Sequence, residues 1–371
     1  MNIYLGASGA INPLGNSVSS IFDAMKSGQT GIAKFPNAFD LGKDEFLGII
    51  DEKLLSGGDG SKIYRMLNSS IQQTLEGLED TSILKSPRTR LIICSTKGDI
   101  DELEKANPSG ANLTRLGEHI QRKLQMENEP LIVSSACISG LLGVINGARM
   151  IQQNLADHVL VAGADLVTKF TLSGFISFYA TATGVSKPYD ADRDGINLGE
   201  AAASTILSKD PSIFKKVEAE YLGGASANDA NHISGPSRTG EGLYRSVKNA
   251  FVDASISAKS VDYISAHGTA TSFNDEMESI AFDRHDMGKI QLNSFKGYFG
   301  HTLGAAGLIE SLIGIESLRK DTLLKSYGFE KQGTSKNINV LSANKEGSFN
   351  IMLKTASGFG GSNAVGIFRK V

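Results

Sequence analysis

Short apolar runs rich in β-branched residues recur along the chain and alternate with longer amphipathic stretches. They predict strands at residues 90–95, 130–135, 158–164, 203–208, 261–267, 289–294, 348–353 and 364–370. Short apolar runs bounded by turn residues are typical of buried strands. Their alternation with helical segments predicts an α/β fold with buried mixed sheets.

Two segments have the strongest helical pattern. Ile138–Leu155 carries apolar side chains around most of its circumference until a pair of glutamines, which predicts a central, buried helix. Leu308–Leu318 predicts a second helix, in which Glu310 and Glu316 stand among apolar residues. A carboxylate in such surroundings needs a compensating partner.

The order of elements repeats along the chain. PLIVSSAC followed by ISGLLGV resembles KIQLNSFKGYFGH followed by TLGAAGLIESL, and each segment is followed by a predicted strand pair. We therefore expect an internal duplication with two similar halves, residues 1–210 and 211–371, that change over near Lys209–Val217. The absence of a low-complexity linker favours halves fused through one stack of sheets over two mobile domains.

Composition and charge exclude several function classes. Lys and Arg number 37 against 40 Asp and Glu, so no basic field favours nucleic acid or an anionic membrane. The N-terminal residues lack a charged region before an apolar stretch, and no apolar run is long enough to span a bilayer. Two cysteines are too few for a disulfide framework or a Cys-rich metal site, so we expect free thiols and a cytoplasmic protein.

Cys137 lies between a predicted strand and the predicted central helix, in SSACISG. The N–H groups of a first helical turn stabilise a thiolate and hold an oxyanion, which makes Cys137 a candidate nucleophile. The alternative is a small thiol that only packs between strand and helix. Gly140 leaves room for a neighbouring segment or a ligand. Cys94 has no helix start after it, and we predict a structural role for it.

His267 and His301 each follow a strand or a tight turn in the second half. His267 ends VDYISAH and precedes Gly268, Thr269 and Thr271, and His301 lies between KGYFG and TLGAAG. Either histidine alone fits a structural role as well as catalysis, but the two together favour catalysis. A helix that begins just after His301 would disfavour its imidazolium and leave a neutral ring able to donate to an oxyanion.

Lys296 lies at the end of the strand KIQLNS, where an unpaired charge is costly. We predict a buried ammonium that orients the site and is compensated by Glu278 and Glu310. The alternative is a surface lysine whose stem extends out of the strand end.

The segment GFGGSNA, residues 358–364, lies between the last two predicted strands. Phe359 is a single bulky side chain among glycines, which supply a mobile loop and exposed backbone N–H groups. An ordinary glycine-rich hairpin is the alternative. The segment lacks the spacing of a phosphate-binding loop and precedes a strand, so we discount a nucleotide.

Together these motifs resemble the ordered signature motifs of the elongating β-ketoacyl-acyl-carrier-protein synthases of the thiolase superfamily. The segments that carry the resemblance are SSAC at 134–137, AHGTAT with the following ND at 266–275, KGYFGHTLGAAG at 296–307 and GFGGSNA, together with residues 187–202 and 226–242. The Cys–His–Asn arrangement of initiating and chalcone-synthase-like enzymes fits poorly, because His301 occupies the third position.

The resemblance implies a thiolase-like fold of five layers (αβαβα) with two similar halves. It implies an acyl carrier protein as partner, whose phosphopantetheine arm delivers the substrate, and a homodimer or a heterodimer with another ketosynthase-like chain. No bound cofactor or metal is implied, because the thioester leaving group and decarboxylation drive the reaction.

The resemblance also implies roles for individual residues. Cys137 attacks an acyl thioester, and the backbone N–H groups of Cys137 and Phe359 hold the oxyanion. His267 and His301 stabilise the enolate that forms as a malonyl unit loses carbon dioxide. Phe359 also gates the acyl pocket. The matching supporting positions are Thr269 and Thr271 for the pantetheine arm, and Lys296 with the carboxylates Glu278 and Glu310.

Some features depart from the family's usual pattern. The chain is short, with compact stretches near residues 35–62 and 170–187, NLGEAAA replaces a more glycine-rich form, and ISG follows Cys137. These departures favour a specialised pathway, such as aryl-polyene or other pigment-type polyketide synthesis, over membrane fatty acids. Two alternatives are a non-condensing chain-length-factor-like partner subunit, which typically lacks the nucleophile, and a thiolase-like acyltransferase, which needs a second well-placed cysteine.

Overall fold

The largest feature of the computed structural model is an 11-stranded sheet among the residues it describes, 1–55, 60–229 and 235–371. Residues 56–59 and 230–234, parts of two segments singled out above, lie outside that description. The first half supplies β1 (Ile3–Ile11), β4 (Thr89–Cys94), β5 (Leu131–Val133), β6 (His158–Asp165) and β8 (Ala201–Ser208). The second half supplies β9 (Val217–Asn228), β10 (Tyr263–Ser265), β11 (Gln291–Asn293), β13 (Asn339–Val340), β15 (Ile351–Gly358) and β16 (Ser362–Lys370).

Both halves arrange their strands in the same way. In the first, the order is β5-β4-β6-β8-β1, with β4 parallel to β5 and β6 and the remaining pairs antiparallel. In the second, the order is β11-β10-β15-β16-β9, with the same parallel and antiparallel pairs. An antiparallel pairing of β1 with β9 joins the two groups into one sheet. The predicted boundary between residues 210 and 211 stays a prediction.

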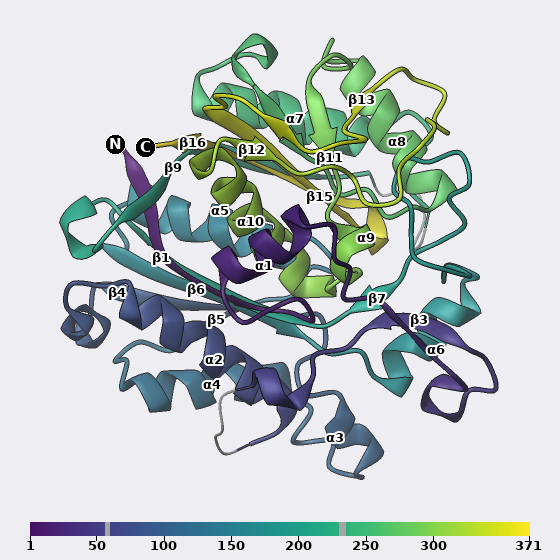
Figure 1. Ribbon diagram of the computed structural model, residues 1–371. Helices are drawn as coiled ribbons and strands as arrows, with labels where there is room; N and C mark the ends of the chain where they lie inside the picture. The colour runs from purple at the N-terminus through teal and green to yellow at the C-terminus, as the bar shows by residue number, and fades with distance from the viewer. Residues whose placement is uncertain (56–59, 230–234) are drawn as a thin grey trace.

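Helices form the other three layers (Figure 1). α5 (Ser139–Gln152) and α10 (Ala306–Arg319) pack against each other between the two groups of strands. α2 (Lys62–Glu76) and α4 (Leu113–Leu124) cover the outer face of the first group, and α7 (Glu241–Ala254) with α8 (Ser272–Asp283) covers that of the second. The five-layered α/β prediction is therefore confirmed.

The remaining elements are short. The helices are α1 (Val18–Lys26), which packs on α10, α3 (Asp101–Glu104), α6 (Lys169–Ser177) and α9 (Lys296–Phe299). β2 (Ala33–Phe35), β3 (Glu45–Gly48) and β7 (Leu198–Gly199) form a separate small sheet, and β12 (Thr322–Leu323) pairs with β14 (Lys345–Glu346). Across the described ranges, no helix has the length and apolar character needed to cross a membrane.

The sequence pattern did not predict β1 and β9, the two strands that join the halves, because glycines interrupt their apolar runs. A Cβ at Gly9 would lie 2.0 Å from the Ser70 carbonyl oxygen of α2, and one at Gly223 would lie 2.6 Å from the Ala254 nitrogen of α7. The glycines allow the outer helices to lie directly on these strands. The same glycines interrupt the apolar runs, so the strand pattern is hidden in the sequence.

The contact between α5 and α10 also depends on glycine. A Cβ at Gly140 would lie 2.8 Å from both the Gly304 carbonyl oxygen and the Leu308 nitrogen. The room that the sequence predicted at Gly140 is therefore filled by the start of α10. This close approach brings the chain beside Cys137 against the chain after His301.

Replacing Gly140 by alanine should destabilise the protein by about 1–3 kcal/mol, because the new methyl group overpacks a contact with backbone atoms. Gly174→Ala is the matched control, since Gly174 is also helical and a Cβ there meets nothing within 4 Å. Alanine's better helix propensity should leave that variant as stable as the parent or up to about 1 kcal/mol more stable. Urea unfolding measures both, and equal midpoints for the two variants would contradict the packing argument.

Candidate active site

Cys137 lies in a strained turn between β5 and α5. Ala136 has a left-handed backbone with φ of 46°, which a non-glycine residue adopts only when its surroundings hold it there. The Ser139 hydroxyl supplies that restraint, since it accepts the Ser135 N–H at 2.8 Å and donates to the Ala136 carbonyl at 2.6 Å. The turn fixes the Cys137 thiol at the N-terminal end of the central helix α5.

The Cys137 thiol is buried, with 7% of the residue exposed, and it receives the backbone N–H of Phe359. Burial raises the pKa of Cys137 to about 11, although the positive charges of Lys97 and Lys296 act in the opposite direction. Burial therefore opposes the thiolate that the helix start was predicted to favour, and we expect a neutral thiol in the resting site. Cys94 is fully buried in the core, and burial raises its pKa further still.

His267 and His301 lie side by side in the interior. Their ring centroids are 5.2 Å apart and their planes meet at 83°. The backbone of His301 is fixed by the 187–202 segment, since its N–H donates to Asn197 O at 2.7 Å and its carbonyl accepts the Gly199 N–H at 3.0 Å. That family segment therefore positions one of the two imidazoles.

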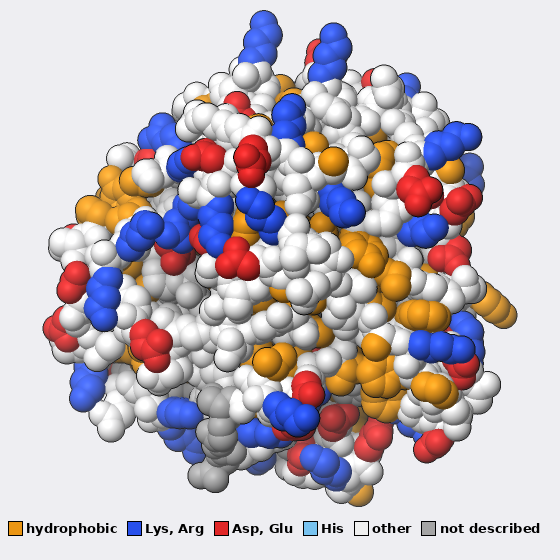
Figure 2. All heavy atoms as spheres, viewed as in Figure 1, with side chains coloured by type: hydrophobic (Ala, Val, Ile, Leu, Met, Phe, Trp, Pro, Cys, Tyr) orange, Lys and Arg blue, Asp and Glu red, His pale blue; other side chains and the backbone are white. Residues whose placement is uncertain are grey.

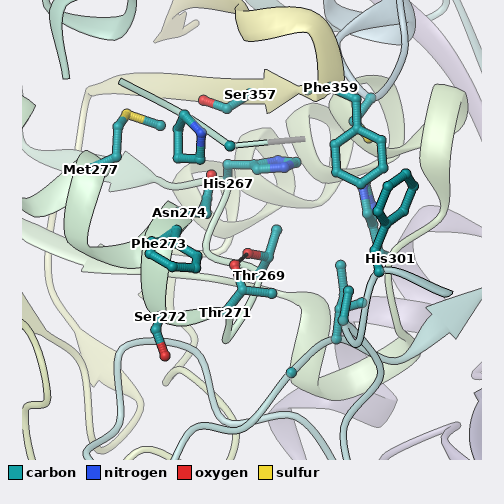
Figure 3. A pocket seen from close by; sticks show the side chains of 18 of the residues that line it. His267, Thr269, Thr271, Ser272, Phe273, Asn274, Met277, His301, Ser357 and Phe359 are labelled. Carbon is teal, nitrogen blue, oxygen red and sulfur yellow. Dashed lines mark hydrogen bonds between the residues drawn. The ribbon is translucent and has the colours of Figure 1, made fainter. Parts of the chain in front are cut away.

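The hydrogen bonds of Lys296 define the tautomer of His267. The Lys296 ammonium donates to His267 Nδ1 at 3.3 Å and to the His267 carbonyl at 2.6 Å. An ammonium has no acceptor, so Nδ1 must be the unprotonated nitrogen and Nε2 carries the proton. Figure 3 shows the His267 ring directed toward Phe359 with His301 on the same side, so the Nε2–H is available to a ligand.

Both histidines are neutral near neutral pH. Burial, and then the Lys296 ammonium, lowers the pKa of each well below its usual range. The helix that was expected to begin just after His301 and lower its pKa does not begin there: a short 3-10 turn at Leu303–Ala305 follows His301, and α10 begins only at Ala306. Within the described residues, neither ring nitrogen of His301 has a hydrogen-bond partner, so this ring is a ready donor or acceptor in the cavity.

Lys296 belongs to a fully buried cluster with Glu310 and Lys354. The Glu310 carboxylate binds Lys296 at 2.7 Å through one oxygen and Lys354 at 2.6 Å through the other. Lys354 also donates to the carbonyls of Ser265 and Ala266 at 3.2 Å, directly before His267. Sequence analysis missed Lys354, because a single lysine in the apolar strand β15 gave no sign of its partner.

Glu278 is buried but does not pair with Lys296, which corrects that part of the prediction. Its carboxylate accepts the backbone N–H groups of His267 at 3.0 Å and Gly268 at 2.7 Å, and the Tyr189 hydroxyl at 2.8 Å. These bonds explain why the carboxylate lies here: it holds the turn that carries His267.

Cys137, both histidines, Thr269 and Thr271 line one cavity of about 470 Å³. The hydroxyls of the two threonines are 2.8 Å apart, and Figure 3 shows them together on one wall of the cavity. The buried carboxylate of Asp275 accepts the Thr269 N–H at 2.9 Å and fixes that wall. Burial raises the pKa of Asp275 to about 7.

A second cavity, of about 950 Å³, meets the first at Cys137 and Phe359. The Phe359 ring packs against Phe175 and Phe178, with centroids 5.5 Å away from each. Phe359 therefore stands between the two cavities. Lys97 lines the second cavity and was another residue that sequence analysis did not single out.

Comparison with known proteins identifies the beta-ketoacyl synthase family over most of the chain. The model for the beta-ketoacyl synthase N-terminal domain matches residues 76–211, and the model for the C-terminal domain matches residues 218–330. The chain is 28% identical to the 3-oxoacyl-[acyl-carrier-protein] synthase 2 of Coxiella burnetii, over 98% of this chain and 97% of that protein. It is 31% identical to the enzyme of the same name from Rhizobium meliloti, over 68% and 62%.

Solved structures agree with the fold. A chain from the complex of a ketosynthase (ApeO) with its chain length factor (ApeC) from Xenorhabdus doucetiae superposes with a TM-score of 0.92 and 26% identity, covering 100% of this chain and 98% of that one. A beta-ketoacyl synthase from Burkholderia phymatum gives 0.89 at 21% identity, covering 100% and 99%.

The raised pKa of Cys137 predicts a pH profile for alkylation. Below about 11 the thiolate fraction grows roughly tenfold per pH unit, so the rate of iodoacetamide modification should climb steadily from pH 7 to pH 9. Peptide mass spectrometry follows Cys137, with native-state Cys94 as an unmodified internal control. A rate that levels off below pH 7 would show a resting thiolate.

The shared carboxylate predicts an order of stability losses. Glu310→Gln leaves two buried ammonium groups without their counter-charge and should cost about 3–5 kcal/mol. Lys354→Met should cost less, because the Lys296–Glu310 pair survives. Urea unfolding of the two variants measures both losses. A larger loss for Lys354→Met would contradict the assignment of Glu310 as the common counter-charge.

Proposed function

Since the chain belongs to the β-ketoacyl synthase family, we propose that it is a 3-oxoacyl-[acyl-carrier-protein] synthase that lengthens acyl chains by decarboxylative Claisen condensation. The observation that carries this proposal is the placement of a thiol and two neutral imidazoles around one cavity. The unpaired ring of His301 and the Nε2–H of His267 suit a ligand oxygen that gains negative charge.

In the first half-reaction, the Cys137 sulfur attacks the carbonyl carbon of an acyl thioester. The pantetheine sulfur leaves and takes up the proton that the thiol releases. The backbone N–H groups of Cys137 and Phe359 hold the oxyanion, in keeping with the bond from Phe359 to the thiol.

In the second half-reaction, the bond from the malonyl unit to its carboxylate breaks and carbon dioxide leaves. The electron pair forms an enolate, whose oxygen accepts hydrogen bonds from His267 and His301. The enolate carbon then attacks acyl-Cys137, a carbon–carbon bond forms and the thiolate leaves. Lys296 orients His267, and its positive charge favours the transient anion.

The two cavities divide the substrate between them. We assign the pantetheine arm of the carrier protein to the cavity with Thr269 and Thr271, whose hydroxyls face it, and the acyl chain to the second cavity. Phe359 separates them and is the proposed gate. Gly360 and Gly361, with φ of 78° and 76°, give the adjacent loop a backbone that side chains would strain.

We propose that the protein works as a dimer, with a second copy or with another ketosynthase-like chain. β5 ends the large sheet with an unpaired edge in the described sheet order, and its Leu131 is 43% exposed. Figure 2 shows hydrophobic side chains gathered on the side that bears β3 and α6, where α6 carries the exposed Phe170. A free thiol nucleophile also fits the reducing cytoplasm as the proposed compartment.

Among the alternatives, the non-condensing subunit is not favoured, because the nucleophile and both histidines are present and meet in one cavity. The similarity to 3-oxoacyl-[acyl-carrier-protein] synthases supports chain elongation on a carrier protein. The departures of this sequence from the family's usual pattern favour a pigment-type polyketide pathway, such as aryl-polyene synthesis, over membrane fatty acids.

The test separates acylation from decarboxylation. The protein is incubated with a carrier protein that bears an acyl thioester. Mass spectrometry of the intact protein and of its peptides should place the acyl adduct on Cys137. Cys94→Ala is the control and should load normally. An adduct on Cys94, or none with any acyl-carrier protein, would contradict the proposal.

Variants of Cys137 and of the two histidines should then affect different steps of the reaction. Cys137→Ala should lose condensation but still decarboxylate malonyl-carrier protein, because enolate stabilisation depends on the histidines. His267→Ala and His301→Ala should each lose roughly 10²–10³ in decarboxylation rate, as for the loss of one oxyanion donor. Unchanged decarboxylation in either His variant would contradict its assigned role.

A further inference from the structure

Lys97 lies in a rigid turn at the wall of the second cavity, which it lines together with Cys137. The buried Asp165 carboxylate holds the turn, since it accepts the Ser95 hydroxyl and the Thr96 N–H, both at 2.9 Å. Gly98 follows with a left-handed φ of 63°. The backbone at Lys97 is therefore fixed close to the nucleophile.

The Lys97 ammonium has no carboxylate partner within salt-bridge distance in the described ranges. It donates a hydrogen bond to the Thr96 hydroxyl at 2.7 Å. Asp165 is near, but its second oxygen already accepts the Gly304 N–H at 2.6 Å. Glu104 lines the same cavity without an ion pair to Lys97.

The charge of Lys97 acts on the nucleophile. Among the charges near Cys137, Lys97 is the strongest influence that lowers the pKa of the thiol, and it also acts on His301. Lys97 is half-buried and lines the same cavity as Cys137, so its charge lies near the point at which the acyl chain would join the protein.

A plain alkyl chain in this cavity would displace water from the Lys97 ammonium without supplying a hydrogen-bond acceptor, which is unfavourable. A chain with carbonyl or hydroxyl oxygens near its thioester end would replace that water with acceptors. An ammonium donates three hydrogen bonds, and Thr96 occupies one of them.

We propose that Lys97 determines specificity by selecting acyl chains that carry oxygen acceptors near the thioester over alkyl chains of the same length. This inference rests on the proposed function, because it concerns the chain that Cys137 accepts. It assigns the substrate class to oxygenated, polyketide-type chains.

The experiment is a competition between equal amounts of 3-oxooctanoyl-carrier protein and octanoyl-carrier protein, with the two Cys137 adducts distinguished by mass. The parent protein should load the oxygenated chain at least about tenfold faster, in line with the lower end of the worth of one hydrogen bond to a charged group. Lys97→Met, of similar length and apolar, should abolish or reverse that preference, and Lys97→Arg should keep it.

Lys85→Met is the matched control, because Lys85 is exposed and lines neither cavity, and its preference should equal the parent's. Equal loading of both chains by the parent, or an unchanged preference in Lys97→Met, would overturn the inference. If Lys97→Met fails to fold, Lys97→Leu also removes the charge and every hydrogen-bond donor of the side chain and decides the question in the same assay. Failure to load any chain would instead count against the proposed function.

Discussion

The buried Glu310 carboxylate is the interaction on which the site depends. It compensates two ammonium groups that are both fully removed from water, one from α9 and one from β15. Without it, two positive charges would share the interior, a cost that packing alone does not offset. Because Lys296 then donates to His267 while Lys354 holds the carbonyls before it, one carboxylate on the central helix α10 fixes a histidine on another segment.

The fold brings these groups together through its duplication. Each half ends a parallel strand in a turn and follows it with a central helix, so α5 and α10 begin near one another. Cys137 precedes one helix and His301 precedes the other. Glycine at the crossing lets the two helix starts approach to backbone contact. The proposed nucleophile Cys137 and the two imidazoles therefore come from different halves but share a cavity.

The sequence singled out three side chains that meet at one cavity, but it did not predict their protonation states. Cys137 and His267 follow strand ends and His301 follows the glycine turn after α9, where small residues mark turns, and their order matches a family. Lys354 stands in an apolar strand without any such mark, and its partner Glu310 is distant in the chain. Lys97 precedes a glycine turn, but only the fold brings it to the cavity that Cys137 lines. Glu278 was found, but its partners are backbone N–H groups, which a sequence does not display. The strands β1 and β9 were missed because contacts with helices required glycine.

The thiol and the two imidazoles are uncharged before substrate reacts, which is consistent with the proposed condensation. Burial keeps the thiol protonated and both imidazoles uncharged, so neither histidine supplies a fixed positive charge to the cavity. A negative charge develops only when a thioester oxygen becomes an enolate or a tetrahedral oxyanion. At that moment the N–H donors and the positive charge of Lys296, which Glu310 already holds in place, act in a medium that screens them weakly. Donors fixed before the charge appears need no reorganisation, so the interior that makes the ionised thiol costly also makes the transient anion easier to stabilise.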